Sequence, residues 1–206
     1  MRVAILANGD TFQHFAGNHI LKPYDKVWGL NQQAAIKNMR LDRCFVMDDL
    51  KLRMPYYAGH EFTEWLKTYK LPIITSREYP EWPTAKAYPI KEICHYFGLP
   101  LGISMYSTPD YMIALAIMEG ATHIALYGVD MTNKSVPPEM TDATAQWIGA
   151  AEARGVFVRT FQGSRYQGIT NVGIAMEAGL YGYAQRPRIE DLVNPEYYEE
   201  WRDALR

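Results

Sequence analysis

One stretch, Tyr106–Met131, constrains the fold of this chain more than any other. It opens with Ser-Thr-Pro at 107–109, which offers capping oxygens and a proline suited to the first position of a helix. Residues 111–118 are apolar on every side and predict a helix that is buried all round. Residues 121–127 form a short apolar run, closed by Gly-Val-Asp, that is typical of an interior parallel strand. A buried helix followed by a buried strand predicts a doubly wound α/β domain.

Three further strands are predicted in the first 50 residues, and polar residues follow each of them. The predicted strands are residues 2–7, 26–30 and 41–47. In doubly wound sheets, ligands lie beyond the carboxyl ends of the parallel strands. The residues that follow these three strands, the Gly-Val-Asp segment and the Ser-Thr helix start are therefore expected to face one crevice. They are Asn8, Gly9, Asp10, Thr11, Asn31, Gln32, Asp48, Asp49, Ser107, Thr108, Gly128, Val129 and Asp130.

The first of these turns has the general form of a phosphate-binding loop. A strand is followed by glycine and then by polar residues opening a helix, so that backbone amides and the helix dipole converge. The turn at residues 8–11 has one glycine and lacks both the dinucleotide fingerprint and the P-loop lysine. An ordinary β-to-α turn explains these four residues equally well.

The remaining chain is predicted to continue the α/β pattern. Amphipathic or apolar periodicity predicts helices at 61–69, 90–97 and 142–154, strands at 71–75 and 156–161, and an irregular proline-rich connector at 78–89. The polar segment 132–141 follows the Gly-Val-Asp strand end, and it is either a lid over the crevice or an ordinary surface loop. We expect one domain over residues 1–190 and a helical tail over 191–206.

Composition excludes some classes of function. The 206 residues carry a net charge of -2, which gives no electrostatic footprint for nucleic acid or an anionic membrane. No apolar run is long enough for membrane insertion, no signal peptide is evident, and the two cysteines are unpaired by spacing, so a cytoplasmic protein is expected. The 5 histidines are scattered, which argues against a metal site.

The order of these motifs resembles that of the bacterial sialyltransferases that build lipo-oligosaccharide caps, and of bacterial and bacteriophage proteins akin to them. The family's Gly-Asn-Gly-Pro-Ser is similar to residues 7–11, and its Cys-Asn-Gln to residues 30–32. Its Thr-Ser-Gly helix start is similar to residues 107–109, and its Ser-Gly-Ile-Asp to residues 127–130. Asp48 matches a polar residue that ends the family's third strand. The resemblance covers about residues 2–131.

The resemblance implies a Rossmann-like glycosyltransferase that uses a nucleotide sugar. Asn8, Asn31 and the helix start at 107–108 would hold the phosphate and sugar of the donor, and residues 128–130 would lie along the nucleoside. Such amides could stabilise the departing phosphate, so no cofactor is required and magnesium is not expected. The acceptor is left open between a carbohydrate, a small molecule and a modified nucleic-acid base. The aromatic tail suits either a homo-oligomer interface or core packing.

One departure from the family concerns the general base. The sialyltransferases carry a histidine after Ser-Gly-Ile-Asp, whereas this chain has no histidine beyond His123. A base must accept the proton of the acceptor hydroxyl. The carboxylates available for that catalytic role are Asp48 and Asp49 at a strand end, and Glu139 and Asp142 on or beside the segment 132–141.

Two other functions remain open from the sequence. A phosphoryl or pyrophosphoryl transferase of the same fold would use magnesium, with Asp48, Asp49 and Asp130 as its ligands. A non-catalytic nucleotide-binding module would need neither magnesium nor a base, and the missing histidine favours it. A fold shared by all three does not decide between them.

Overall fold

The structure is a computed structural model, and it describes residues 1–15, 24–36, 39, 41–98 and 105–166. All of these residues lie in the first of the two units into which the chain divides, Met1–Thr170. The predicted tail helix at 195–205 and the predicted boundary at residue 190 lie outside the described residues.

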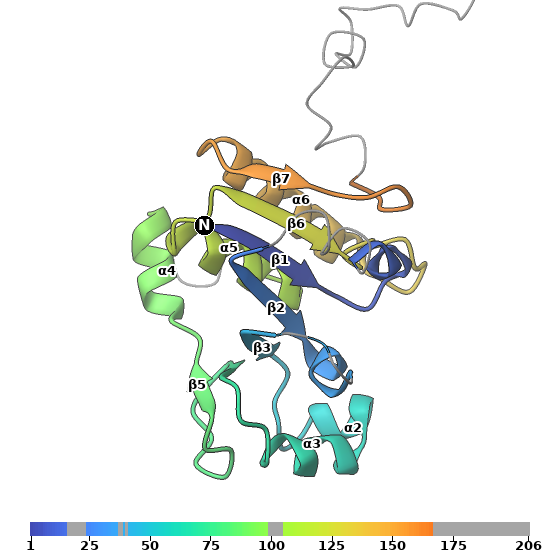
Figure 1. The fold of residues 1–206 in the computed structure, drawn as a ribbon, viewed down its shortest axis with the longest axis vertical. Coiled ribbons are helices and arrows are strands. Elements are labelled where there is room, and N and C mark those ends of the chain that lie inside the picture. Colours follow the sequence, from blue (N-terminus) through green and yellow to red (C-terminus); the bar gives the residue numbers. More distant parts are fainter. Residues whose placement is uncertain (16–23, 37–38, 40, 99–104, 167–206) are drawn as a thin grey trace, which may run out of the picture. The chain divides into compact units, whose positions relative to one another are not determined.

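A single parallel sheet organises the described residues. Its order is β5-β4-β3-β2-β1-β6-β7, and every neighbouring pair is parallel. Figure 1 shows β7 at the top, with β6, β1 and β2 below it in turn. The strands are β1 (Arg2–Leu6), β2 (Lys26–Leu30), β3 (Arg43–Val46), β4 (Ile73–Thr75), β5 (Ala85–Ala87), β6 (His123–Tyr127) and β7 (Phe157–Arg159). The predicted doubly wound α/β fold is confirmed.

The central strands are buried on both faces, as expected of parallel strands covered on each side. Residues 3–6 of β1 and 124–127 of β6 are almost fully shielded from solvent. β1 pairs with β2 on one side and with β6 on the other. Strands β2 to β5 therefore extend the sheet on one side of β1, and β6 and β7 extend it on the other. The carboxyl ends of these two strands mark the switch point at which doubly wound folds bind ligands.

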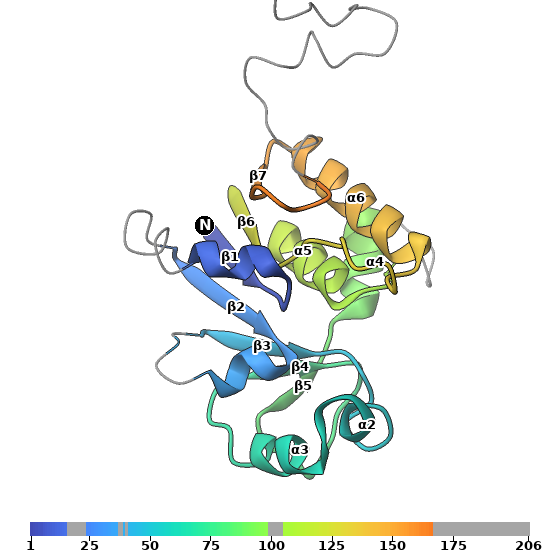
Figure 2. The ribbon, with the colours of Figure 1, turned by 90° about the vertical axis from the view of Figure 1, so that its right-hand side faces the viewer.

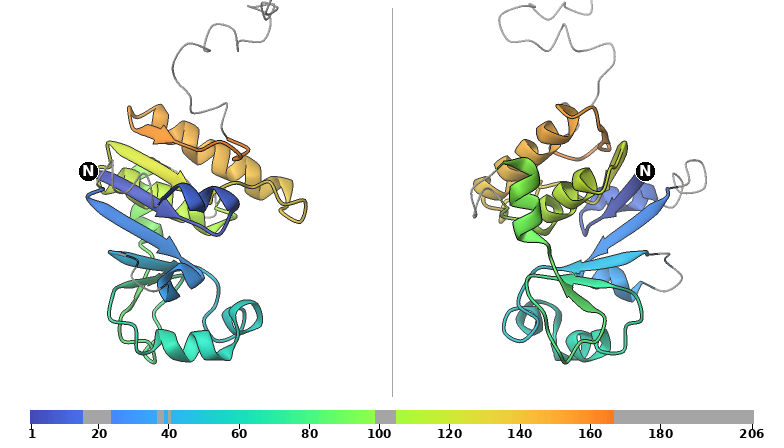
Figure 3. Two further views of the ribbon diagram at one scale, coloured as in Figure 1. Left: turned by 45° about the vertical axis from the view of Figure 1, so that its right-hand side comes forward. Right: turned by 90° about the vertical axis from the view of Figure 1, so that its left-hand side faces the viewer.

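Helices cover the two faces of the sheet. One core packs α4 (Ile90–Phe97), α5 (Thr108–Met118) and α6 (Pro138–Glu152) against one face. The other core involves the residues after η1 (Asp10–Gln13), together with α2 (Met54–Ala58) and α3 (His60–Leu66). Figures 2 and 3 show α4, α5 and α6 together on one side of the sheet, with η1 on the other.

Helix α5 confirms the prediction of a helix that is buried all round. Residues 112–117 are all buried, and α5 contacts β1, β2 and β3. A helix that packs against a sheet on one side and against α4 and α6 on others has no solvent-facing stripe, so its sequence is apolar all round.

Several boundaries differ from the predictions. Helix α6 begins at Pro138 rather than near residue 142, because proline suits the first turn and Glu139 favours a helix N-terminus. Residues 138–141 are therefore helical and only 132–137 remain as a loop. The segment after β2 forms the short 3-10 helix η2 (Asn31–Ala35), and the connector 78–89 contains strand β5. Helix α2 was not predicted at all. The described residues contain no helix long and apolar enough to span a membrane.

Candidate functional site

A pocket of about 290 Å³ lies at the switch point between β1 and β6. The turn after β1 and the segment after β6 form most of its wall, and single residues at the end of β2 and at the start of α5 complete it. Its lining residues are Ala7, Asn8, Gly9, Leu30, Pro109, Gly128, Val129, Asp130, Met131, Thr132, Asn133 and Val136. We call this the switch-point pocket.

Two glycines let the strand ends approach each other. The ladder between β1 and β6 continues past the strands, with the amide of Ala7 donating to Tyr127 O at 2.7 Å and that of Gly9 to Gly128 O at 2.9 Å. Gly128 has φ 71°, and a Cβ there would collide with the carbonyl of Ala7. A Cβ on Gly9 would lie 2.7 Å from Gly128 O and would collide with the carboxylate of Asp130. Both positions therefore require glycine.

Asp130 ties the segment after β6 to the turn after β1. Its Oδ2 accepts the amide of Thr11 at 2.8 Å, and its Oδ1 accepts the hydroxyl of the same residue. Thr11 Oγ1 in turn accepts the amide of Gly128 at 2.9 Å. Asp130 and Thr11 are both buried. Each carboxylate oxygen thus already accepts one hydrogen bond from the protein, and the two residues hold the wall of the pocket together.

Gln33 fixes the side chain of Asn8. The Nε2 group of Gln33 donates to Ala7 O at 3.1 Å and to Asn8 Oδ1 at 2.9 Å. Since Asn8 Oδ1 accepts this bond, its Nδ2 group is left to donate to a ligand in the pocket. Gly29 makes the arrangement feasible, because a Cβ there would lie 3.0 Å from Gln33 Cβ. The sequence does not reveal this role of Gln33, since its partners Ala7 and Asn8 follow a different strand.

Asn31 lies at the carboxyl end of β2 in a left-handed conformation, with φ 47°. Asparagine adopts this conformation more readily than most residues. Its Oδ1 and the Oε1 of Gln33 are both buried, and neither has a hydrogen-bond partner among the described residues. Buried acceptors without a partner are unfavourable and suit a site in which a ligand supplies the donor.

The start of α5 carries a buried carboxyl group of its own, that of Asp110. Asp110 Oδ2 accepts the amides of Tyr106 at 2.9 Å and Ser107 at 2.8 Å. Its Oδ1 accepts a hydrogen bond from the hydroxyl of Thr144 at 2.6 Å, and Thr144 Oγ1 lies 3.2 Å from Ser107 Oγ. Burial raises the pKa of Asp110 above its ordinary value, against the opposing effect of these hydrogen bonds. Ser107 is buried in this network, whereas Thr108 is half-buried beside the pocket-lining Pro109.

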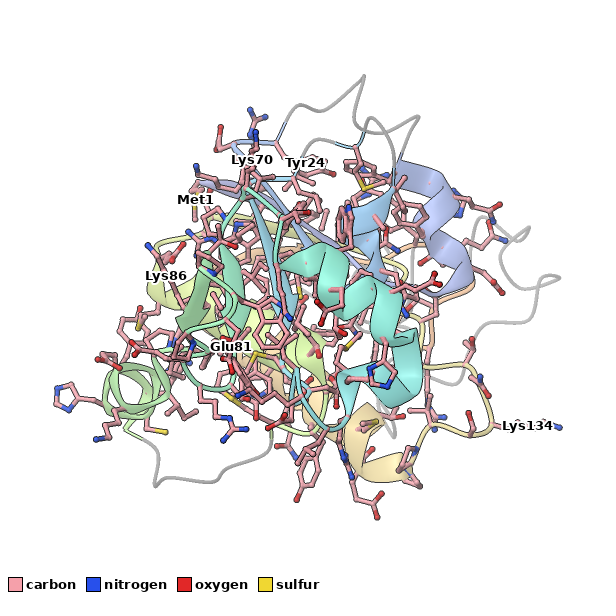
Figure 4. The ribbon with its side chains drawn as sticks, turned by 90° about the horizontal axis from the view of Figure 1, so that it is seen from below. Met1, Tyr24, Lys70, Glu81, Lys86 and Lys134 are labelled. Atoms are coloured by element: carbon pink, nitrogen blue, oxygen red, sulfur yellow. The ribbon has the colours of Figure 1, made fainter. Side chains whose placement is uncertain are left out.

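The loop 131–137 forms the outer wall of the pocket. Met131 has φ 52°, and Asn133 Oδ1 accepts the amide and the hydroxyl of Ser135 at 3.0 and 2.9 Å. Figure 4 shows Lys134 pointing away from the rest of the protein at the outer end of this loop. The sequence predicted a lid or a surface loop here, and Thr132, Asn133 and Val136 line the pocket.

The structure brings some of the predicted site residues together and leaves others apart. Asn8, Gly9 and residues 128–130 line one pocket. Thr11 lies behind the wall, bonded to Asp130, whereas Asp10 and Gln32 are exposed outside the lining. Asn31 follows the pocket-lining Leu30. Their roles in binding a donor stay predictions.

The candidate carboxylates are not among the lining residues. Asp48 is half-buried at the end of β3, and Glu139 and Asp142 are exposed on α6. Burial raises the pKa of Asp49, but the amides of Lys51 and Leu52 and the guanidinium of Arg77 outweigh it and lower that pKa. Across the described ranges, no three His, Cys, Asp or Glu side chains gather in a way that could hold a metal ion.

Comparison with solved structures places this fold among known proteins. The chain superposes on a sialyltransferase, CstII, crystallised with a trisaccharide acceptor and CMP, with a TM-score of 0.55 and 16% identity over 98% of this chain and 99% of that one. The fold is similar to that of a bacterial sialyltransferase. A CstII structure from Campylobacter jejuni with cytidine-5'-monophosphate gives a TM-score of 0.53, again at 16% identity, over 98% of each chain. A mutant of CstII, described as an alpha-2,3/8-sialyltransferase, gives 0.54 at 16% identity over 98% of this chain and all of that one (100%). No protein-family model and no curated protein sequence matches significantly.

Proposed function

We propose that this chain binds a cytidine-nucleotide-activated sugar in the switch-point pocket and transfers the sugar to an acceptor. The observation that carries the proposal is the pocket itself, which lies where doubly wound folds bind nucleotides and is lined by Asn8 with a fixed amide. Similarity over nearly the full chain to a transferase crystallised with CMP supports the choice of nucleotide.

In this proposal the chain's own amides do the work of binding. Asn8 Nδ2 donates to an oxygen of the donor, and the buried Oδ1 of Asn31 accepts from one of its hydroxyl or amino groups. Donors aimed at the phosphate oxygens stabilise the negative charge that grows on the nucleotide as the bond to the sugar breaks. The sugar carbon forms its new bond to the acceptor oxygen, whose proton passes to a base.

The base is proposed among the carboxylates around the pocket. Glu139 and Asp142 follow the loop 131–137 whose residues line the pocket, and Asp48 lies two residues after the end of β3. A base that acts in the chemical step changes the rate without changing donor affinity. Glu139→Gln, Asp142→Asn and Asp48→Asn should therefore be compared for the turnover of bound donor, at equal donor affinity.

The test is calorimetric titration with CMP and with CMP-N-acetylneuraminate in the presence of EDTA, followed by assay of CMP release. Asn8→Ala removes one hydrogen bond to the ligand and is expected to weaken binding by about 3- to 10-fold. Gln146→Ala, on the exposed face of α6, is the matched control and should bind like the unaltered chain. Absence of binding, or equal affinity in both variants, would contradict the proposal.

A second candidate is a binding module that does not turn its ligand over. One observation favours it: Asp130 is the ionisable side chain in the pocket lining, and both of its oxygens already accept hydrogen bonds from Thr11. Binding of the CMP-sugar without CMP release, with acceptor oligosaccharides present, would select this candidate over the transferase.

A further inference from the structure

A second pocket of about 290 Å³ lies on the sheet far from the strand ends that form the first. It is near the amino ends of β1, β6 and β7, on the face opposite α5, where Ala125 and Tyr24 belong to the second core. Figure 4 labels Tyr24 and Met1, which precede β2 and β1 at this edge. We call it the sheet-face pocket.

Strand register builds this pocket from two rows of side chains. Arg2 pairs with His123, and His123 pairs with Phe157, so these three residues form one row across the strands. The next row on the same face consists of Ala4, Ala125 and Arg159. Because successive residues of a strand point to opposite faces, both rows share one face. Ala125, the alanine of this second row that lines the pocket, leaves a hollow where a larger apolar side chain would fill the core.

Arg159 gives the hollow an unmet hydrogen-bonding requirement. Its Nη1 atom is buried and has no hydrogen-bond partner in the described part of the chain, while its guanidinium carbon lies 4.9 Å from the centre of the Phe161 ring. A buried donor without a partner is unfavourable, and more so when the group is charged. The guanidinium presents N–H groups in a planar fork that matches a carboxylate or phosphate.

The other lining groups have the same preference. Arg2 adds a second positive charge, and the ring of His123 can donate a hydrogen bond. The described residues that line the pocket include no carboxylate. The nearby Asp25 accepts the backbone amide of Arg2 at 2.6 Å, and its side chain is exposed to solvent. Phe157 is 48% exposed and its ring centre lies 5.7 Å from that of His123, so an apolar surface borders the charged one.

We propose that the sheet-face pocket binds a small organic anion, whose carboxylate or phosphate group contacts Arg159 and Arg2 and whose apolar body lies against Phe157 and Ala125. This site is separate from the switch-point pocket, and it does not depend on the function proposed there. It joins a half-buried arginine whose Nη1 atom is buried, a second arginine and an exposed aromatic ring around the side chain of Ala125.

The test uses benzoate and phenyl phosphate as probes, with benzyl alcohol as the neutral counterpart, in calorimetric titrations of the full chain. At least one anion should bind and benzyl alcohol should not, and the better anion identifies the acid group. Arg159→Gln is expected to weaken binding at least about 10-fold, the loss typical of one charge-assisted hydrogen bond. Arg154→Gln is the matched control, because Arg154 lies over Phe97, on α4 at the other face.

Two further variants separate this site from the other pocket and from damage to the fold. Ala125→Leu fills the hollow without changing charge and should abolish binding even if Arg159→Gln fails to fold. Asn8→Ala alters the switch-point pocket and should leave binding of the probe unchanged. The proposal is overturned if neither anion binds, if Ala125→Leu or Arg159→Gln binds as tightly as Arg154→Gln, or if Asn8→Ala abolishes binding.

Discussion

Gly128 allows β1 and β6 to meet at the candidate site, and a single methyl group would separate them. Its φ is positive, and a Cβ would collide with backbone rather than with a flexible side chain. Gly120 has φ 80°, but no described atom outside its own neighbourhood lies within 4 Å of its Cβ position. The two glycines thus share a backbone conformation and differ only in crowding.

Gly128→Ala should therefore destabilise the protein more than Gly120→Ala. The strained conformation alone costs about 1–2 kcal/mol, which is the expected effect at Gly120. Crowding against Ala7 adds about 1–3 kcal/mol at Gly128. Urea unfolding followed by circular dichroism measures both free energies, and equal losses would show that the strand ends separate freely.

The hydroxyl of Thr11 acts both as donor and as acceptor. It donates to Asp130 and accepts the amide of Gly128, in a buried position. Thr11→Val keeps the shape but leaves a carboxylate oxygen and an amide without partners, so a loss of about 2–4 kcal/mol is expected from the two groups. Thr11→Ser keeps the hydroxyl and should recover most of that loss in the same unfolding assay. Equal stability of the two variants would argue against a stabilising role for the hydrogen bonds of this hydroxyl.

At the scale of elements, the start of α5 depends on a carboxyl group that burial makes reluctant to ionise. Burial raises the pKa of Asp110 from 3.8, and its hydrogen bonds to Thr144, Ser107 and Tyr106 oppose that rise without cancelling it. The folded protein therefore binds this proton more tightly than the unfolded chain. The stability that it contributes is fully present below pH 3.8 and is lost as the pH rises through the raised pKa.

Asp110→Asn removes this titration while an amide can still accept from Tyr106 and Ser107 and donate to Thr144. The difference in unfolding free energy between the unaltered protein and the variant should shift in favour of the unaltered protein as the pH falls from about 7 to about 4. Other carboxyl groups titrate in both proteins and drop out of the difference. A difference that does not change with pH, measured by urea unfolding, would contradict the raised pKa.

Elements with a strong local pattern could be predicted from the sequence, and those set by tertiary contacts could not. Helix α5 and strand β6 carry continuous apolar runs, because both are buried on all sides. Strand β5 is three residues long, reads Ala-Lys-Ala and exists through its pairing with β4. The short η2 has no apolar period of its own, and the start of α6 depends on which proline begins the first turn.

The candidate site was predictable to the extent that it follows from strand ends. Asn8, Gly9 and residues 128–130 share a pocket because parallel strands end at one edge. The sequence does not reveal that Thr11 and Asp130 bond to each other, since they are 119 residues apart in the chain. The role of Gln33 in orienting Asn8 also depends on a contact between strands.

At the scale of the whole described unit, the sheet order explains why the two pockets lie at opposite ends of the same strands. The switch-point pocket forms where β1 and β6 end, and the sheet-face pocket forms where they begin, together with β7. Both pockets therefore depend on the pairing of β1 with β6. If the proposed ligands bind, a ligand in either pocket is expected to stabilise the sheet that both pockets share, because binding favours the folded state.

The pairing of β1 with β6 also sets the order of events during synthesis of the protein on the ribosome. Val3 and Ile124 are partners in the sheet, so β1 is synthesised long before its second neighbour exists. Until then one edge of β1 offers unpaired amides and carbonyls to any other strand. The sheet order thus leaves β1 exposed to misassembly between its own synthesis and the arrival of β6.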